Sequence, residues 1–522
     1  MKRCALLSSL LLLAGLSSHA ETAAPQVKVA QGTLEGTRNT DLYMFKGVPF
    51  AAPPVGTLRW RPPQPATPWK GVRDADAFAA RCMQRPVFSD MKFRSNGVSE
   101  DCLYLNVWTS TLDASARQPV LVYFYGGGFI AGDGSEFRYD GASMARRGIT
   151  TVTVNYRLDV FGMFAHPELT RESPDHASGN YTLLDQAAAL KWVRANIAAF
   201  GGDPDRITIA GESAGSMSVS SLMASPLSKE LIAGAIGESG STLFHLMPLS
   251  HGEQSGVAFM KAAGATSLAQ LRRMPADQLL ELAGREGMPR MSIIQDGLFF
   301  TEQPTETFAQ GRQAHVPLLA GSNSQENSYG ALLKQEPPTP ANYARALQTR
   351  FGGANAARLM KLYPGNTEAE VMSSGTALAG DMFLGYVTWK WVDLHTTTGG
   401  APTYYYYYSH PRPVTVAEPD KPAEPGAVHS AEIEYAMGNL ATNKVFAWTP
   451  EDYRVSAVMQ EYFANFIRHG NPNDEHLPDW GAYGDAHHPR MTIDVESKLA
   501  PDAHRERYEL LKEIIDGAGP RG

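Results

Sequence analysis

Short apolar runs separated by amphipathic stretches dominate the middle of the chain. The apolar runs lie at residues 103–108, 120–125, 150–155, 206–210, 231–237, 316–320 and 403–408. Between two of them, Leu183, Ala187 and Leu190 fall on one helical face, and Gly201 and Gly202 end that helix. Because strands that alternate with helices form parallel sheets, the pattern predicts an α/β fold with a central, mostly parallel sheet.

The pattern changes on either side of this alternating region. Short strands are expected before it, at residues 27–29, 32–34 and 45–50. Residues 250–300 and 340–400 read as mixed helix, and we expect helical insertions around residues 245–315 and 335–400 to wall or lid a pocket. Residues 411–425 are rich in proline and charge, which predicts a long loop.

The composition is that of an ordinary globular protein. The chain has 522 residues, with 46 Lys and Arg against 54 Asp and Glu, so its net charge is -8. A mildly acidic balance argues against nucleic-acid binding, which needs a basic patch. With no internal repeat, we expect one domain over residues 21–522, since large α/β enzymes of this length often form one. The oligomeric state stays open.

The first 20 residues have the features of a targeting segment. Lys2 and Arg3 precede an apolar stretch at residues 5–16, and Ser-His-Ala at 18–20 is a small-x-small cleavage site. An apolar run of about 12 residues is too short to span a bilayer, which needs roughly 20. We therefore expect residues 1–20 to be a cleaved signal peptide, and the protein to be secreted or periplasmic without stable membrane insertion.

Two cysteines, Cys82 and Cys102, remain once the signal segment with Cys4 is removed. In an oxidising compartment an isolated pair most often forms a disulfide, and this one closes a loop of about 20 residues, for roughly 3 kcal/mol of stability on the chain-entropy estimate. The alternative is two buried free thiols.

Residues 206–216 carry the clearest chemical signal. An alternating apolar strand at 206–210 leads into a G-x-S-x-G motif at 211–215, and a compact stretch that can form a helix follows to residue 224. Such a sharp strand-to-helix turn lifts the central Ser213 above the sheet and places it at a helix N-terminus. That position suits a nucleophile.

A serine nucleophile needs a base, and the base needs an acid that orients it. Ligands gather beyond the carboxyl ends of strands in open α/β sheets, so the partners should follow later strands. Glu326 and His429 satisfy this condition in the order Ser…Glu…His. Spacing alone does not close the choice, because other downstream residues compete: His245, His251, His410, His469, Asp296, Glu302 and Glu434.

The glycine run at residues 126–128 directly follows a strand. Glycines let backbone N–H groups crowd a developing negative oxygen, so the run predicts an oxyanion hole. A flexible turn is the alternative. The run lacks the pattern of a phosphate-binding loop.

Several segments resemble the type-B carboxylesterases, the α/β-hydrolase group that includes the cholinesterases and the non-enzymatic neuroligins. Residues 45–60 resemble the family's N-terminal region, and residues 100–106 resemble its signature around a disulfide cysteine. Residues 125–129 resemble the oxyanion segment, residues 200–215 the nucleophile signature, and residues 428–434 the histidine segment. The resemblance covers roughly residues 27–515. It implies the α/β-hydrolase fold, with helical insertions that wall a catalytic gorge.

Carried over residue by residue, the resemblance implies Ser213 as nucleophile, Glu326 as triad acid and His429 as base. The family usually has Asp-Glu-Gly-Ser or Asn-Glu-Gly around the acid, whereas this chain has Gln-Glu-Asn-Ser at residues 325–328. The glutamate itself is kept, so Glu326 stays the expected acid.

The resemblance also implies supporting residues. The second and third glycines of the run, Gly127 and Gly128, and the residue after the nucleophile, Ala214, match the oxyanion hole. Glu212 matches a pocket carboxylate beside the nucleophile, and Ser239 matches a second serine near the triad that helps to hold the histidine and water. The implied reaction is carboxylic-ester hydrolysis through an acyl-enzyme, which needs no metal or cofactor.

Three function classes follow: a general carboxylesterase, a specialised esterase such as a cholinesterase-like or fumonisin esterase, and a non-catalytic binding protein. Cys82 and Cys102 match a disulfide of the family. A cholinesterase-like site needs a tryptophan in the loop between them, to hold a quaternary ammonium by cation–π contact, but the aromatic residues of this loop are Phe88 and Phe93. Retention of the serine, acid and histidine argues against the binding protein. The substrate is a small ester of unknown identity, and the pocket candidates are Phe129, Phe244, Phe299, Phe300, Met382, Phe383 and Phe446.

Overall fold

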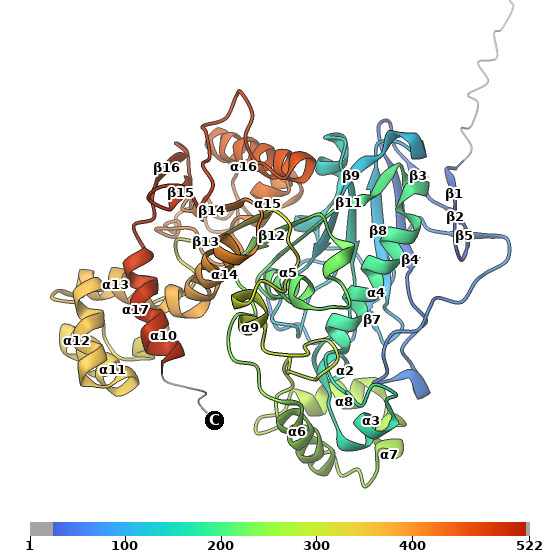
Figure 1. Cartoon of the computed structure of the whole chain (residues 1–522), viewed down its shortest axis with the longest axis horizontal. Coiled ribbons are helices and arrows are strands. Elements are labelled where there is room, and N and C mark those ends of the chain that lie inside the picture. Colours follow the sequence, from blue (N-terminus) through green and yellow to red (C-terminus); the bar gives the residue numbers. More distant parts are fainter. Residues whose placement is uncertain (1–23, 518–522) are drawn as a thin grey trace, which may run out of the picture.

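The computed structural model describes residues 24–517, and a single large sheet runs through this part of the chain (Figure 1). The sheet has 11 strands in the order β16-β15-β14-β13-β12-β11-β9-β10-β8-β4-β3. Its strands are β3 (Thr37–Arg38), β4 (Tyr43–Pro49), β8 (Tyr104–Thr109), β9 (Gln118–Phe124), β10 (Thr150–Val154), β11 (Gly202–Glu212), β12 (Gly234–Glu238), β13 (Leu318–Asn323), β14 (Thr403–Tyr408), β15 (Pro489–Ile493) and β16 (Lys498–Pro501).

The centre of the sheet is parallel and its two edges are antiparallel. Every neighbouring pair from β15 across to β10 is parallel. The pairs at the two edges, β15 with β16 and β10 through β3, are antiparallel. The residues of β10, β12 and β13 are all buried, as expected for strands covered on both faces. The predicted α/β fold with a mostly parallel central sheet is confirmed.

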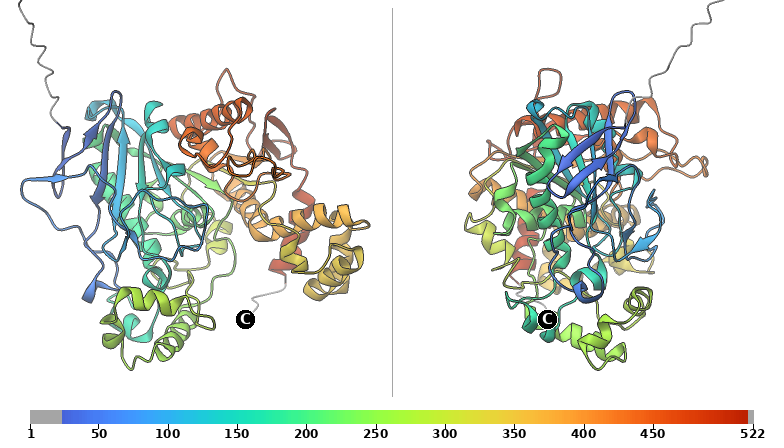
Figure 2. Two further views of the ribbon diagram at one scale, coloured as in Figure 1. Left: turned by 180° about the vertical axis from the view of Figure 1, so that it is seen from behind. Right: turned by 90° about the vertical axis from the view of Figure 1, so that its right-hand side faces the viewer.

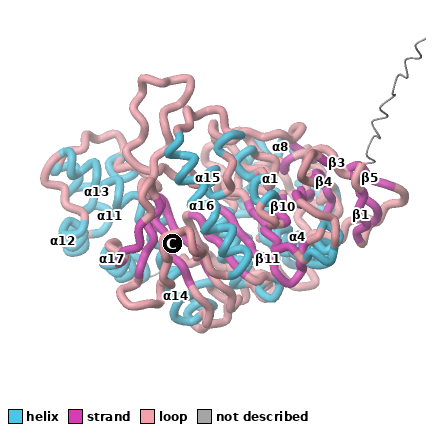
Figure 3. The backbone as a smooth tube through the Cα atoms, turned by 90° about the horizontal axis from the view of Figure 1, so that it is seen from above, coloured by secondary structure: helices cyan, strands magenta, loops and turns pink. Residues whose placement is uncertain are grey.

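Helices flank the strands on both faces (Figure 3). Gly234 and Gly237 of β12 are an odd number of residues apart, so their side-chain positions face opposite sides of the sheet. A Cβ on Gly234 would lie 3.7 Å from Phe466, and one on Gly237 would lie 2.2 Å from Trp391. The helices that carry these aromatic residues, α16 (Pro450–His469) and α14 (Tyr386–Thr398), therefore cover opposite faces.

Two groups of helices lie outside these layers. They form separate projections at two edges of the molecule (Figures 1 and 2). The first group is α6 (Leu249–Ala262), α7 (Leu268–Arg272) and α8 (Ala276–Ala283), and the second is α11 (Pro340–Phe351), α12 (Gly353–Leu362) and α13 (Glu368–Gly380). Both fall in the stretches where helical insertions were expected.

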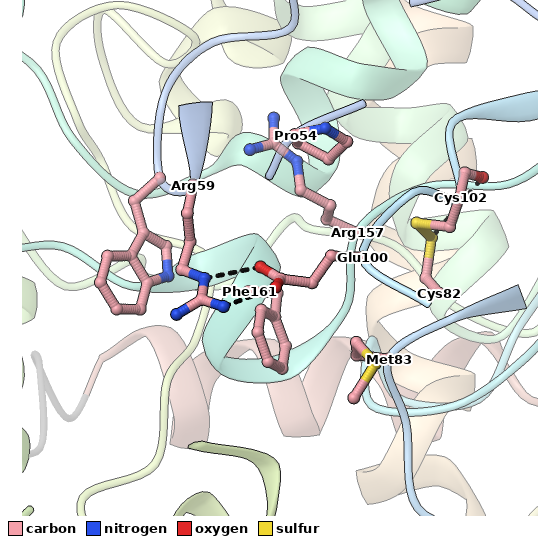
Figure 4. Close-up of a pocket in the computed structure, with 9 residues that line it drawn as sticks. Pro54, Arg59, Cys82, Met83, Glu100, Cys102, Arg157 and Phe161 are labelled. Carbon is pink, nitrogen blue, oxygen red and sulfur yellow. Dashed lines mark hydrogen bonds and ion pairs between the residues drawn. A yellow bond between two sulfur atoms is a disulfide. The ribbon is translucent and has the colours of Figure 1, made fainter. Parts of the chain in front are cut away.

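Cys82 and Cys102 form a disulfide with their Cα atoms 4.9 Å apart, as the sequence predicts. Beside it, Arg59 and Glu100 form a buried ion pair with two hydrogen bonds (Figure 4). Arg59 Nε donates to Glu100 Oε1 at 2.6 Å, and Arg59 Nη2 lies 2.5 Å from Glu100 Oε2. Arg59 also donates to the carbonyl oxygen of Arg272 at 2.9 Å. An arginine that binds a carboxylate through two nitrogen atoms is strongly oriented. Arg59 therefore connects the loop between Cys82 and Cys102, which contains Glu100, to the end of α7.

The C-terminal part of the chain adds elements that the hydrophobic pattern did not predict. They are the strands β15 and β16 and the helix α17 (Arg505–Asp516). Among residues 24–517, no helix combines the length and apolar character needed to cross a membrane. The expected signal peptide, residues 1–20, lies outside the described residues.

Candidate active site

The turn from β11 into α5 (Ala214–Ala224) carries Ser213. Ser213 has φ 56° and ψ -119°, a backbone state that residues other than glycine rarely adopt. Its N–H donates to the carbonyl oxygen of Glu238 at 2.8 Å, which ties the turn to the end of β12. A Cβ on Gly211 would lie 2.5 Å from the carbonyl carbon of Gly215, and one on Gly215 would lie 2.0 Å from the carbonyl oxygen of Phe124. Only glycine fits at these two positions.

Ser213, His429 and Glu326 form a continuous chain of contacts. The Oγ atom of Ser213 lies 3.0 Å from Nε2 of His429, and Nδ1 of His429 lies 2.7 Å from Oε2 of Glu326. Glu326 is only 5% exposed. The three residues follow β11, β13 and the loop after β14, so the carboxyl ends of parallel strands bring them to one edge of the sheet.

The competing acids have other partners. Glu302 pairs with Arg312, and Arg412 donates to Glu434 at 2.7 Å. Asp296 accepts backbone N–H groups of the turn that follows it, at 3.0 Å from the nitrogen of Phe299. These carboxylates therefore hold local structure, and within residues 24–517 none of them has a hydrogen bond or ion pair with His429.

The competing histidines also lie elsewhere. Nε2 of His410 is 2.9 Å from Oδ1 of Asp452. His251 is on α6, His469 ends α16, and His245 is exposed beside a cavity described below. Within the described residues, His429 alone has a hydrogen bond to the Ser213 hydroxyl.

The glycine run lies against the nucleophile turn. A Cβ on Gly126 would be 3.2 Å from the Cβ of Ser213 and 2.5 Å from Oε2 of Glu212. Gly127 has φ 107° and Gly128 has φ 62°, both in the left-handed half of conformational space. In residues 24–517 no acceptor is bound to the N–H of either glycine. Two N–H groups without an acceptor thus directly follow Gly126, the residue that packs against the serine.

Buried carboxylates surround the imidazole. Oε1 of Glu212 lies 3.2 Å from Nε2 of His429, and Tyr123 donates its hydroxyl to Oε1 of Glu238 at 3.0 Å. Burial raises the pKa of Glu212 to about 8 and that of Glu432 to about 7, and it raises the pKa of Glu238 well above its ordinary value. No role was predicted for Glu238 and Glu432 from the sequence. The sequence feature that could have pointed to them is their proximity in the chain, because Glu238 directly precedes Ser239 and Glu432 lies three residues after His429.

Ser239 contacts the acid side of this cluster. Its hydroxyl donates to Oε1 of Glu326 at 2.5 Å and lies 3.4 Å from Oε1 of Glu432. Burial lowers the pKa of His429, but the charge of Glu212 and the hydrogen bond and charge of Glu326 outweigh burial, so the net shift is upward. The imidazolium form of His429 is therefore strongly stabilised.

A cavity of about 250 Å³ opens beside the glycine run. The apolar side chains that line it are Phe129, Met163, Met217, Phe244, Leu246, Met247, Met291 and Ile293. Gly128 lines it as well, so the cavity adjoins the free N–H groups. Two of the seven residues considered for the pocket, Phe129 and Phe244, thus face this cavity.

The remaining pocket candidates differ in position. The ring of Phe383 is 47% exposed and stands edge-on to the imidazole of His429, with centroids 5.5 Å apart. Phe299 and Phe300 are buried in the core at 0% and 2% exposure. The ring of Phe446 is tilted against that of Trp448, with centroids 5.2 Å apart, and Met382 is partly buried against the core. Within residues 24–517, His, Cys, Asp and Glu side chains form no group of three or more that could hold a metal ion.

Comparison with known families decides the identity. The family model described as the carboxylesterase family matches residues 23–511. The chain belongs to the carboxylesterase family. This carboxylesterase is an enzyme that hydrolyses carboxylic esters with a serine, as the sequence resemblance implied.

Individual relatives agree with the family. The carboxylesterase is 34% identical to the fumonisin B1 esterase of Sphingopyxis macrogoltabida, over 86% of this chain and 83% of the relative. It is 32% identical to the para-nitrobenzyl esterase of Bacillus subtilis, over 93% and 98%. Among solved structures it resembles a PNB esterase with TM-score 0.76 and 31% identity, and the Geobacillus stearothermophilus carboxylesterase EST55 with TM-score 0.78 and 29% identity; each match covers 93% of this chain and 99% of the other.

Proposed function

We propose that Ser213, His429 and Glu326 are the catalytic triad of this ester hydrolase. The observation that carries the proposal is the unbroken contact chain, 3.0 Å from Ser213 Oγ to His429 Nε2 and 2.7 Å from His429 Nδ1 to Glu326 Oε2. These are hydrogen-bond distances for proton transfer to a base and for orientation of that base by a carboxylate.

The reaction has two halves. As Ser213 Oγ attacks the ester carbonyl, His429 takes its proton, and Glu326 stabilises the resulting imidazolium. The tetrahedral intermediate collapses, His429 returns the proton to the alcohol, and the alcohol leaves behind an acyl-enzyme on Ser213. Water, deprotonated by His429, then releases the acid.

The N–H groups of Gly127, Gly128 and Ala214 are proposed to bind the oxyanion. Support comes from the free N–H groups of the two glycines that follow Gly126, which packs against Ser213, and from the place of Ala214 in the first turn of α5. N–H groups in the first turn of a helix lack partners within it, and they are donors to negative charge. Glu212 and Ser239 are proposed to support the triad through His429 and Glu326.

The methionine-lined cavity is proposed to hold the acyl group of the substrate. Methionine side chains are flexible and apolar, so they adapt to an unbranched chain better than to a rigid polar group. Each buried methylene contributes about 0.8 kcal/mol, so kcat/KM is expected to rise about four-fold per added methylene until the cavity is full. A panel of p-nitrophenyl esters of graded acyl length tests this expectation.

Two of the relatives suggest bulkier esters. The names fumonisin B1 esterase and para-nitrobenzyl esterase state what those proteins act on, so fumonisin B1 and a p-nitrobenzyl ester belong in the same panel. Preference for fumonisin B1 over every simple ester would favour the specialised role over the general one.

The protein is further proposed to be secreted or periplasmic. The disulfide between Cys82 and Cys102 suits an oxidising compartment, and residues 1–20 have the composition of a signal peptide. N-terminal sequencing of the protein recovered outside the cytoplasm should begin at or near residue 21.

Substitution of the nucleophile tests the proposed triad. Ser213→Ala should abolish turnover of p-nitrophenyl esters and labelling by a fluorophosphonate probe, while the far-UV circular dichroism spectrum is unchanged. Turnover retained by the folded variant would show that another group is the nucleophile. Absence of turnover and labelling in the wild-type protein would favour a non-catalytic binding role.

A further inference from the structure

Asn323, the last residue of β13, stands where the triad acid and the triad histidine meet. It is 3% exposed and lies three residues before Glu326. Its backbone N–H donates to Oε1 of Glu326 at 2.6 Å. Its side-chain Nδ2 donates to the carbonyl oxygen of Val428 at 2.9 Å and to Oε2 of Glu432 at 2.5 Å. Val428 directly precedes His429.

The surroundings of Asn323 specify an amide donor. Both groups within reach of Nδ2 are acceptors, one a carbonyl and one a carboxylate, so only an NH₂ group satisfies both. Hydrogen bonds to an ionised acceptor are about twice as strong as neutral ones. A side chain without a donor would remove one hydrogen bond from each acceptor, and the Val428 carbonyl oxygen would keep its bond from Ala431 N–H at 3.0 Å.

The histidine loop, residues 409–428, has another anchor next to His429, because its Arg412 donates to the carbonyl oxygen of Ser430 at 2.6 Å. Most of residues 416–425 are exposed. The loop also meets the acid segment directly. Ala427 N–H donates to Ser324 Oγ at 2.9 Å, Gln325 N–H donates to the Ala427 carbonyl oxygen at 2.8 Å, and Gln325 Nε2 donates to Glu424 Oε2 at 3.1 Å. A long loop must lose conformational entropy to hold its last residue in one place, so these anchors decide how well His429 is placed.

We propose that Asn323 is a positioning residue of the catalytic apparatus: it clamps the end of the histidine loop to the strand that carries the acid, and so holds His429 in line with Ser213. One side chain reaches both the residue before the histidine and Glu432, while its backbone holds the acid. The inference rests on the proposed triad and adds a residue that touches neither substrate nor Ser213.

The effect on catalysis follows from the geometry. His429 Nε2 is 3.0 Å from Ser213 Oγ, so a shift of about 1 Å takes the pair out of hydrogen-bond range, and such displacements reduce rates about 100-fold. Asn323→Ala should therefore lower kcat 10- to 100-fold and leave KM within about two-fold, because the cavity beside Gly128 is untouched. The rate of fluorophosphonate labelling, which reports Ser213 reactivity without a substrate-binding step, should fall in parallel.

Substitution of Glu432 separates loop anchoring from electrostatics. Glu432→Gln keeps an acceptor for Asn323, and therefore keeps the Val428 contact, but removes a carboxylate whose charge raises the pKa of His429. Both Asn323→Ala and Glu432→Gln should move the acidic limb of the kcat/KM profile to lower pH. In Asn323→Ala the donor that favours ionised Glu432 is lost, so Glu432 protonates more readily. Only Asn323→Ala should also show the large loss of kcat.

Asn327 supplies the matched control on the same segment. Within residues 24–517 the one hydrogen bond of its side chain joins the amide oxygen to the neighbouring N–H of Ser328, at 2.9 Å, so Asn327→Ala should match the wild-type kcat and pH profile. All variants are compared at a temperature well below their unfolding midpoints, with circular dichroism to show that each is folded.

The outcomes distinguish this inference from the triad itself. If Ser213→Ala is inactive but folded Asn323→Ala keeps wild-type kcat and the wild-type acidic limb, the clamp is wrong and the triad stands. If Asn323→Ala and Glu432→Gln lose equal amounts of kcat, the loop anchor is wrong and the effect is electrostatic. If Ser213→Ala stays active, the triad fails first.

Discussion

Adjacent glycines in the proposed oxyanion hole respond differently to one added methyl group. A Cβ on Gly127 would lie 2.2 Å from the carbonyl oxygen of Ala131, on a backbone with φ 107°. A Cβ on Gly128 would have Ile130 Cγ1 as its nearest neighbour, at 3.8 Å, on a backbone with φ 62°. Gly127→Ala must therefore move backbone, whereas Gly128→Ala meets no clash and carries the strain of a positive φ.

The expected losses can be worked from this difference. An alanine in the left-handed helical region costs about 1 kcal/mol relative to glycine, which is the main penalty for Gly128→Ala. Gly127→Ala adds a backbone clash that displaces the loop and its N–H groups. Removal of one oxyanion donor typically lowers kcat by about 100- to 1000-fold, and we expect a loss of this size for Gly127→Ala. For Gly128→Ala we expect a loss below about ten-fold, with a change of KM because Gly128 lines the cavity.

Steady-state hydrolysis of p-nitrophenyl butyrate measures both constants for each variant. The inhibition constant of a trifluoromethyl ketone, whose hemiketal places an oxyanion in the hole, should weaken in Gly127→Ala in proportion to kcat/KM. The reasoning is refuted if folded Gly127→Ala retains kcat, or if the two variants lose kcat equally.

Three further outcomes are expected. Glu326→Gln should lower kcat by about 10⁴-fold with little change of KM, because an uncharged partner stabilises the imidazolium poorly; a loss below ten-fold would move the acid role to another carboxylate. The double variant Cys82→Ser with Cys102→Ser should lower the free energy of unfolding by about 3 kcal/mol, seen as a lower unfolding midpoint, and an unchanged midpoint would show that the loop is held by other contacts. Neighbouring carboxylates raise the pKa of His429, and turnover needs the neutral imidazole, so kcat/KM should fall as the pH drops through an acidic limb centred above 6.5. Glu212→Gln should shift that limb to lower pH, and a shift to higher pH would contradict the proposed effect of the Glu212 charge on the pKa of His429.

Much of the sheet could be predicted because its strands are continuous apolar runs. The tyrosine-rich run at residues 403–408 coincides with β14, since aromatic residues suit a buried pleated strand. The predicted run at 316–320 is displaced, because β13 covers Leu318–Asn323. Its polar end, from Gly321 to Asn323, pairs with Tyr406 to Tyr408, and hydropathy gives no sign of that backbone pairing.

Other strand boundaries shifted for similar reasons. The run at residues 231–237 becomes β12 only from Gly234, because Lys229–Leu231 form a short 3-10 helix first. The strands β15 and β16 were not predicted. They lie at the edge of the sheet in a polar part of the chain, where few apolar residues mark the period of two.

The three residues of the proposed triad could be selected from the sequence because each follows a strand end and because G-x-S-x-G constrains the local backbone. The roles proposed for Glu326 and His429 came from the family resemblance, since their spacing left several rivals open. Asn323 was not accessible in this way. Its importance depends on two acceptors that lie more than 100 positions away in the chain, and a single asparagine carries no periodic signal.

The most direct test of the account is identification of the acylated residue. Acid quenching during turnover of a p-nitrophenyl ester, followed by peptide mass spectrometry, locates the acyl group on the chain. The account predicts an adduct of the acyl mass on Ser213 that forms as fast as the burst of p-nitrophenol and is absent from Ser213→Ala. An acyl group on any other side chain, or turnover at full rate with no acylated peptide at all, would contradict it.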